Sequence, residues 1–294
     1  MVKSRSSHFS QILIYLVLAL FALIWTVPTL GLLITSVRPA DDVATSGWWT
    51  ALQHGAHFTL ANYAEVLGTG GGDASNSAST INLSQAIVNT IIMTLPSTVI
   101  PIFLAALAAY AFAWMNFPGR KVLFMLLVAL LVVPLQMSLI PLLRDYRALG
   151  LSGTFLGVWL ANTGFGLPLA TYLLFNYIAG LPREVFESAV VDGASHPTMF
   201  IRLVVPLSLP AFASFAIFQF LWVWNGVLIP LVFLGDRQEL LVLPQRILQM
   251  LGTYSTNWTL LTAGAFVSLV IPMIVFLGFQ RFFVRGMLAG SVKG

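Results

Sequence analysis

One charged, turn-rich segment interrupts the late apolar part of this sequence: Leu181-Pro-Arg-Glu-Val-Phe-Glu-Ser-Ala-Val-Val-Asp-Gly-Ala-Ser-His-Pro197, continuing to Pro206. Pro182 suits the first turn of a helix, and the carboxylates of Glu184 and Glu187 lie near its positive end. Gly193 suits the left-handed residue that ends such a helix. Because the segment is too polar to cross a bilayer, it predicts a short helix at the membrane surface.

This surface helix is expected to be amphipathic, with one apolar face free for a partner. The residues that share this face are Val185, Phe186, Ala189 and Val190. A second helix start follows, with Ser195 as N-cap and Pro197 in the permissive first turn. The sequence therefore predicts an L-shaped helix-turn-helix.

The spacing of this segment resembles the EAA loop of the permease subunits of ABC importers. Glu187-Ser-Ala189 is followed after three residues by Gly193 and after nine more by Leu203-Val-Val-Pro206, with Ser188, Leu203 and Val205 departing from the family pattern. The resemblance implies a coupling helix that docks on a separate ATPase subunit. Its implied coupling residues are Glu184, Phe186, Glu187, Ser188, Ala189, Asp192, Gly193 and Pro206. The alternative is an ordinary amphipathic cytoplasmic loop.

Composition places the chain among integral membrane proteins, because 58% of its residues are hydrophobic, 8% are charged, and the mean hydropathy is +0.91. Six runs without Asp, Glu, Lys or Arg each exceed the roughly 20 residues that a helix needs to cross the bilayer. These runs are Phe9–Val37, Ala74–Gly119, Val122–Leu143, Ala148–Pro182, Leu203–Gly235 and Ile247–Gln280. We expect an all-α integral membrane protein, a single transmembrane domain over residues 1–294 with about six spans.

The placement of Lys and Arg favours an N-in, C-in orientation, in which the inner segments hold nine basic residues and the outer segments five. This orientation makes residues 1–11 a cytoplasmic N-terminus that leads into a retained anchor, and residues 36–84 an extracytoplasmic loop. Residues 182–202 become a cytoplasmic coupling loop and residues 281–294 a cytoplasmic tail. No cluster of basic residues exceeds a pair, so nucleic acid is not an expected partner. The expected partner around the spans is membrane lipid.

Residues 36–84 are expected to form a flexible outer loop. Trp48 and Trp49 would either contact a delivery protein or serve as interfacial aromatics. The Gly68–Gly72 run lacks the Gly-Lys-Ser/Thr ending of a phosphate loop, and no Walker A pattern occurs elsewhere. We therefore expect no cofactor on this chain. ATP and Mg would bind a partner ATPase, since the spans carry no ionisable residue to couple an ion gradient.

Neutral polar residues at membrane depth suit a hydroxyl-rich solute, because amides satisfy hydroxyls and aromatic rings cover the apolar face of a sugar. The alternative is hydrogen bonding between helices. The candidate substrate path consists of Gln219, Trp222, Trp224 and Asn225. Gln219, Trp222 and Asn225 share a face at a spacing of three, whereas Trp224 lies nearly opposite and is expected to pack structurally.

Further patterns resemble carbohydrate-importer permeases of the maltose-transporter G-subunit type: Phe117-Pro-Gly-Arg120, Trp224-Asn225 with Pro230, and the ending Arg281 to Gly294. Thr45-Ser-Gly-Trp-Trp49 resembles α-glucoside transporters more weakly. The resemblance implies a multi-pass prokaryotic inner-membrane protein that imports a sugar or oligosaccharide by alternating access. It implies a second permease subunit, two ATPase subunits and an extracytoplasmic sugar-binding protein. The implied tail contacts with the ATPase are Gly290, Ser291, Val292, Lys293 and Gly294. The alternative function is a membrane component of an exporter or channel without a binding protein.

Overall fold

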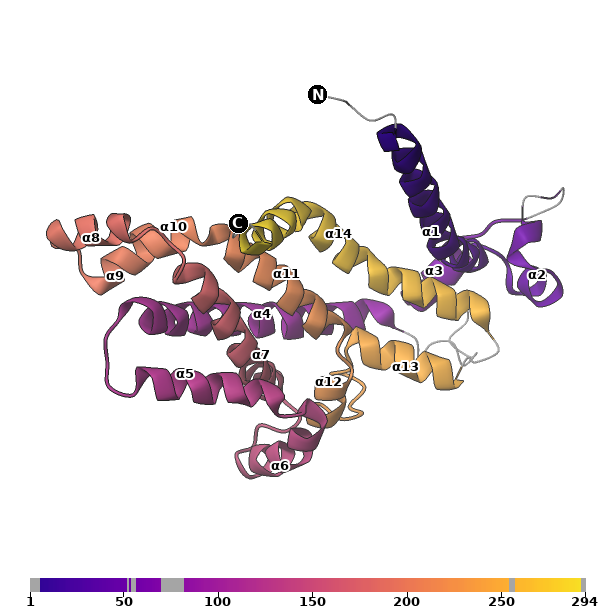
Figure 1. The fold of residues 1–294 in the computed structure, drawn as a ribbon. Coiled ribbons are helices and arrows are strands. Elements are labelled where there is room, and N and C mark those ends of the chain that lie inside the picture. Colours follow the sequence, from indigo (N-terminus) through magenta and orange to yellow (C-terminus); the bar gives the residue numbers. More distant parts are fainter. Residues whose placement is uncertain (1–5, 52, 54–56, 70–81, 254–256, 292–294) are drawn as a thin grey trace. The chain divides into compact units, whose positions relative to one another are not determined.

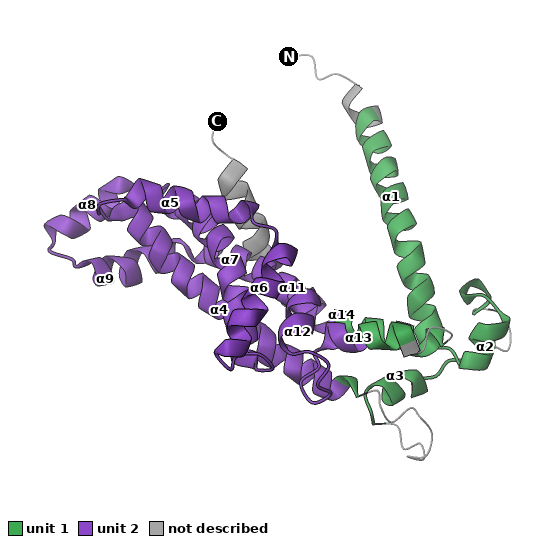
Figure 2. Ribbon diagram, turned by 90° about the horizontal axis from the view of Figure 1, so that it is seen from below, with its two compact units in different colours: residues 1–83, 247–268 green, residues 84–246, 269–294 purple. Residues whose placement is uncertain are grey.

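The computed structural model describes residues 6–51, 53, 57–69, 82–253 and 257–291. Every regular element among them is a helix (Figure 1), so the all-α prediction is confirmed. The chain divides into two compact units: residues 1–83 with 247–268, and residues 84–246 with 269–294 (Figure 2).

Within the described residues, four helices are long and apolar enough to cross a membrane. They are α1 (Ser6–Ser36), α4 (Leu83–Trp114), α7 (Phe155–Ile178) and α14 (Trp258–Ser291). Two bent helix pairs bring the count to six if each pair is one span, which agrees with the predicted number.

The first bent pair turns by 105° between α5 (Arg120–Ala129) with its 3-10 extension η3 (Leu130–Val132) and α6 (Leu135–Ala148). Val133 is extended, with φ −71° and ψ 116°, because Pro134 disfavours the helical conformation in the residue before it. The uncharged run Val122–Leu143 is therefore divided between two helices that meet at this bend.

The second bent pair turns by 72° at Ser208, between two segments that contain Pro206 and Pro210. Its first arm joins α9 (His196–Met199), the π-helix η4 (Phe200–Val204) and α10 (Val205–Leu207). Its second arm is α11 (Leu209–Asn225). The predicted run to Gly235 also breaks at Gly226, which is extended, and resumes as α12 (Leu228–Phe233).

In the first unit, the segment after α1 contains three short helices: α2 (Ala40–Thr45), η1 (Trp48–Thr50) and α3 (Ala61–Val66). The prediction of a flexible loop is therefore wrong for the described residues of 36–69. Residues 70–81, which that prediction also covered, lie outside the described part of the chain.

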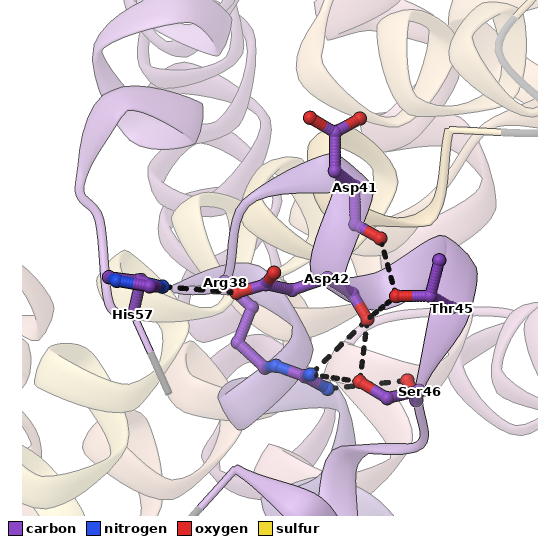
Figure 3. Close-up of polar contacts among 6 residues, drawn as sticks. All are labelled: Arg38, Asp41, Asp42, Thr45, Ser46 and His57. Carbon is purple, nitrogen blue, oxygen red and sulfur yellow. Dashed lines mark hydrogen bonds and ion pairs between the residues drawn. The ribbon is translucent and has the colours of Figure 1, made fainter. Parts of the chain in front are cut away.

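The Arg38 side chain organises this segment (Figure 3). It is 4% exposed, and its guanidinium donates to the carbonyls of Asp42 at 3.2 Å and Gly47 at 3.0 Å and to the Ser46 hydroxyl at 2.6 Å. The Asp42 carboxylate lies 3.9 Å from His57 instead. Arg38 thus satisfies carbonyls at the end of a short helix, which holds the turn that follows α1.

A second polar contact set joins α3 to the same turn. The Asn62 amide donates to the carbonyls of Ser36 and Arg38, both at 2.9 Å, and the Tyr63 hydroxyl lies 2.7 Å from that of Ser36. Trp48 packs so closely on α1 that a methyl group on Gly31 would lie 2.9 Å from its ring. Trp49, by contrast, is 70% exposed. Of the two predicted contact tryptophans, only Trp49 presents most of its surface.

In the second unit, the surface helices α8 (Arg183–Val191) and α9 lie at one end and α12 lies at the other (Figures 1 and 2). One apolar cluster joins α4, α7 and α8, and another joins α6, α7 and α12. Near α12, the Asn89 amide of α4 donates to the carbonyls of Glu239 and Leu241 at 2.9 and 3.0 Å. The loop after α12 is thereby fixed to the beginning of α4.

Candidate functional site

The α8 helix ends as the sequence predicts. Gly193 has a φ of +76°, its N–H donates to the Val190 carbonyl at 3.0 Å, and the Ala194 N–H donates to the Ala189 carbonyl at 2.9 Å. These two bonds form a Schellman motif, which needs a left-handed residue at the glycine position. Ser195 precedes α9, but its hydroxyl contacts that of Thr198 at 2.9 Å and makes no capping bond to the backbone.

The predicted coupling residues divide into an exposed and a buried group. The exposed members are Glu184, Glu187, Ser188, Asp192, Gly193 and Pro206. Ala189 is half-buried, and Phe186 is only 3% exposed. The apolar face that the sequence leaves free for a partner is therefore closed at Phe186. A partner would meet the carboxylates and the exposed side chain of Val190 instead.

Phe186 is buried because it stacks on Trp114 at the end of α4, with ring centroids 3.9 Å apart and planes 15° apart. The Trp114 indole N–H donates to the Ile178 carbonyl at the end of α7, at 3.2 Å. A helix end leaves its last carbonyls without intrahelical donors, so this bond satisfies one of them. The contacts link α8 directly to the ends of two membrane-length helices.

A second link runs through α9. The Tyr110 hydroxyl of α4 lies 2.8 Å from Nδ1 of His196. A hollow of about 370 Å³ borders this pair, and its walls also include Trp114, Phe186 and Glu187. Both arms of the surface turn are thus attached to α4.

On α11 the structure separates the candidate path residues. Trp224 is 1% exposed and stacks on Phe220, with centroids 5.4 Å apart, whereas Trp222 is 54% exposed. The Asn225 amide is exposed and donates to the Leu221 carbonyl of its own helix at 2.9 Å. Gln219 is 3% exposed, and its amide donates to the Ser97 carbonyl of α4 at 3.2 Å.

The Ser97 carbonyl accepts this bond because Pro101, four residues later, has no N–H to donate within α4. Pro96 likewise leaves the Ile92 carbonyl without its helical donor, and the Trp159 indole of α7 donates to it at 3.0 Å. Gln219 therefore has a structural role in joining α11 to α4.

Gln219 and Trp222 also line a cavity of about 730 Å³ bounded by η3, α6, α7 and α11. Trp224 and Asn225 do not line it. The sequence did not single out the α6 and α7 residues of its wall, among them Ser138, Asp145 and Gly164. No pattern along the chain marks them, because the bend at Pro134 is what brings α6 against α7.

Comparison with known proteins assigns the family. Residues 66–289 match the family described as binding-protein-dependent transport system inner membrane component. The chain belongs to this family. It is therefore a multi-pass transport component of the membrane, and its family is not one of enzymes.

Several relatives match this transport component along nearly its full length. An osmoprotective compounds uptake permease protein of Synechocystis sp. is 52% identical, covering 99% of this chain and 95% of the relative. An alpha-glucoside transport system permease protein of Rhizobium meliloti is 42% identical, covering 96% and 97%. A chain from a bacterial ABC transporter involved in the import of alginate has the same fold, with a TM-score of 0.72, 21% identity and coverage of 96% and 99%.

The predicted tail of this transport component is only partly described. Helix α14 continues through residues 281–291 without a break, so Gly290 and Ser291 belong to its last turn. Val292, Lys293 and Gly294 lie outside the described residues. Their expected contact with an ATPase stays a prediction.

Proposed function

We propose that this chain is one of two membrane-spanning subunits of an ATP-driven importer for a neutral sugar or oligosaccharide. The named activities of its relatives, uptake of osmoprotective compounds and of alpha-glucosides, support this solute class. Two separate ATPase subunits would bind ATP and Mg, and an extracytoplasmic sugar-binding protein would deliver the solute. The membrane would be the inner membrane of a prokaryote, with both termini and residues 182–202 on the cytoplasmic side.

The attachment of α8 is the observation that carries the coupling role. Phe186 is stacked on Trp114 while Glu184 and Glu187 are exposed on the same short helix. A partner that moved the exposed side of α8 would move the ends of α4 and α7 with it, because Trp114 contacts both Phe186 and the Ile178 carbonyl. Such a rigid connection suits alternating access, in which ATPase closure drives rearrangement of the spans.

The test is reconstitution of the complete complex in proteoliposomes with its binding protein. We expect ATP-dependent sugar uptake, and we expect Glu187→Ala to weaken stimulation of ATP hydrolysis by the loaded binding protein. Arg147→Ala is the control, since Arg147 is an exposed charged residue at the end of α6. Normal stimulation of ATP hydrolysis in Glu187→Ala would show that this carboxylate does not belong to the coupling surface. Failure of the wild-type complex to transport any sugar would overturn the proposed function itself.

A further inference from the structure

We infer that the cavity between α6, α7 and α11 binds one ring of a neutral, polyhydroxylated solute, so that this chain itself contacts the transported molecule. The inference rests on the proposed transport function. The cavity volume of about 730 Å³ lies within the roughly 300–1,000 Å³ that is typical of small-molecule sites. A single sugar ring with part of a second would fill it.

The depth of the cavity favours a solute over a protein partner. Its α7 wall runs from Leu160 to Leu169, which is the middle of a helix that spans Phe155–Ile178. An ATPase or a binding protein would contact the ends of the spans instead. The middle of a membrane-length helix is reached by a molecule that passes along it.

The polar groups of the wall suit hydroxyl donors. Gly164 can line the cavity only with backbone atoms. Its carbonyl has no helical donor within α7, because Pro168, four residues later, lacks an N–H. The Asp145 carboxylate and the Gln219 amide add further acceptors. Several hydroxyl groups on one ring could therefore donate to this wall at once.

The aromatic groups suit the apolar face of the same ring. Trp222 is 54% exposed and lies nearly parallel to Phe218, with centroids 6.5 Å apart and planes 24° apart. Both side chains line the cavity. An exposed indole in a largely apolar wall provides a flat platform with one N–H donor at its edge.

The charge of the wall decides between sugar types. Asp145 is the one charged side chain among the described residues that line the cavity, and no Lys, Arg or His lines it with Asp145. A carboxylate in a wall that carries no basic side chain repels an acidic sugar, because like charges oppose binding. The cavity is therefore expected to accept neutral glycosides and to reject uronic acids.

The test uses the absence of cysteine from this chain. In the purified complete complex, Ser138→Cys places a single thiol in the cavity wall, and its reaction with N-ethylmaleimide is followed on this subunit. We expect maltose, at about ten times its dissociation constant, to slow that reaction roughly tenfold by mass action. An alginate trisaccharide should give no protection. Trp25→Cys is the control, since Trp25 is 78% exposed on α1 and lines no part of this cavity.

Transport provides the second measurement. Trp222→Leu should raise the KM of maltose uptake about tenfold, the factor that corresponds to roughly 1.4 kcal/mol of lost stacking. Trp25→Leu, the same substitution at another exposed tryptophan, should not change it. Co-purification with the ATPase checks that the Trp222 variant folds and assembles.

Three results would overturn the inference while leaving the proposed function intact. Maltose that is transported but neither protects Ser138→Cys nor depends on Trp222 would place the solute on the second subunit. A thiol that reacts in the isolated chain and is inert in the complex with or without maltose would show that the second subunit fills the cavity. Equal protection by the alginate trisaccharide would refute the charge argument.

Discussion

Replacing Phe186 with alanine tests whether α8 acts through its attachment to α4. Phe186 is 3% exposed and stacked on Trp114, and deletion of a buried phenylalanine ring costs about 3–5 kcal/mol. We expect the lower end of that range, because the hollow of about 370 Å³ beside the pair lets neighbouring side chains relax into the gap. The lost energy should appear as local opening of α8, since neither Phe186 nor Trp114 belongs to the middle of a span.

Tryptic cleavage after Arg183, the first residue of α8, measures this opening in the purified complex. A loss of about 3 kcal/mol raises the population of the open form roughly 100-fold, and cleavage should accelerate in proportion while opening and closing remain fast. Val191→Ala is the control, because Val191 belongs to the same helix and is 86% exposed. Its cleavage rate should match that of the wild type.

Sugar uptake in proteoliposomes then connects opening to transport. Phe186→Ala should lose uptake together with its protection from trypsin, and Trp114→Ala should show the same loss. The double variant should be less impaired than the sum of the two single variants, because both remove one contact. Loss of uptake in Phe186→Ala without faster cleavage would refute the reasoning, since it would mean that Phe186 contacts a partner directly.

Substitutions at three further positions test other parts of the structure. At Gly193 a methyl group would meet nothing within 4 Å, so Gly193→Ala should reduce uptake only through a backbone strain of about 1–2 kcal/mol. Gly193→Asn should be milder, and equal rates for both would contradict this. Arg38→Met removes the guanidinium bonds to Asp42, Ser46 and Gly47, so amide hydrogen exchange at Ser46 should accelerate at least about tenfold; unchanged exchange would show that other contacts hold the turn. Asn89→Ala frees two carbonyls of the loop after α12, and exchange at Leu240 should accelerate, whereas the exposed control Gln136→Ala should leave it unchanged.

The sequence predicted those features that depend on local chemistry. Hydrophobic length alone set the number of spans, and the requirement for a positive φ identified Gly193 as the end of α8. Helical spacing placed Trp222 and Trp224 on different sides of α11, and the structure exposes one and buries the other.

Features that depend on distant contacts could not be predicted in this way. Helical spacing put Phe186 on an apolar face, but only the position of Trp114, 72 residues earlier in the chain, determines that this face is covered. Likewise, the polarity of residues 36–69 indicated a loop. Arg38 was counted there as a topology signal, although its side-chain hydrogen bonds hold the turn between α2 and η1.

The prolines of α4 show where local and distant chemistry meet. Each of Pro96 and Pro101 removes one backbone donor, so the sequence alone identifies two carbonyls that need a partner inside the membrane. Only the fold reveals that Trp159 of α7 and Gln219 of α11 supply the missing donors. A polar side chain in an uncharged span can thus serve helix packing and still face a cavity, as Gln219 does. The two interpretations that the sequence set against each other for such residues, solute contact and interhelical hydrogen bonding, are therefore compatible within a single amide.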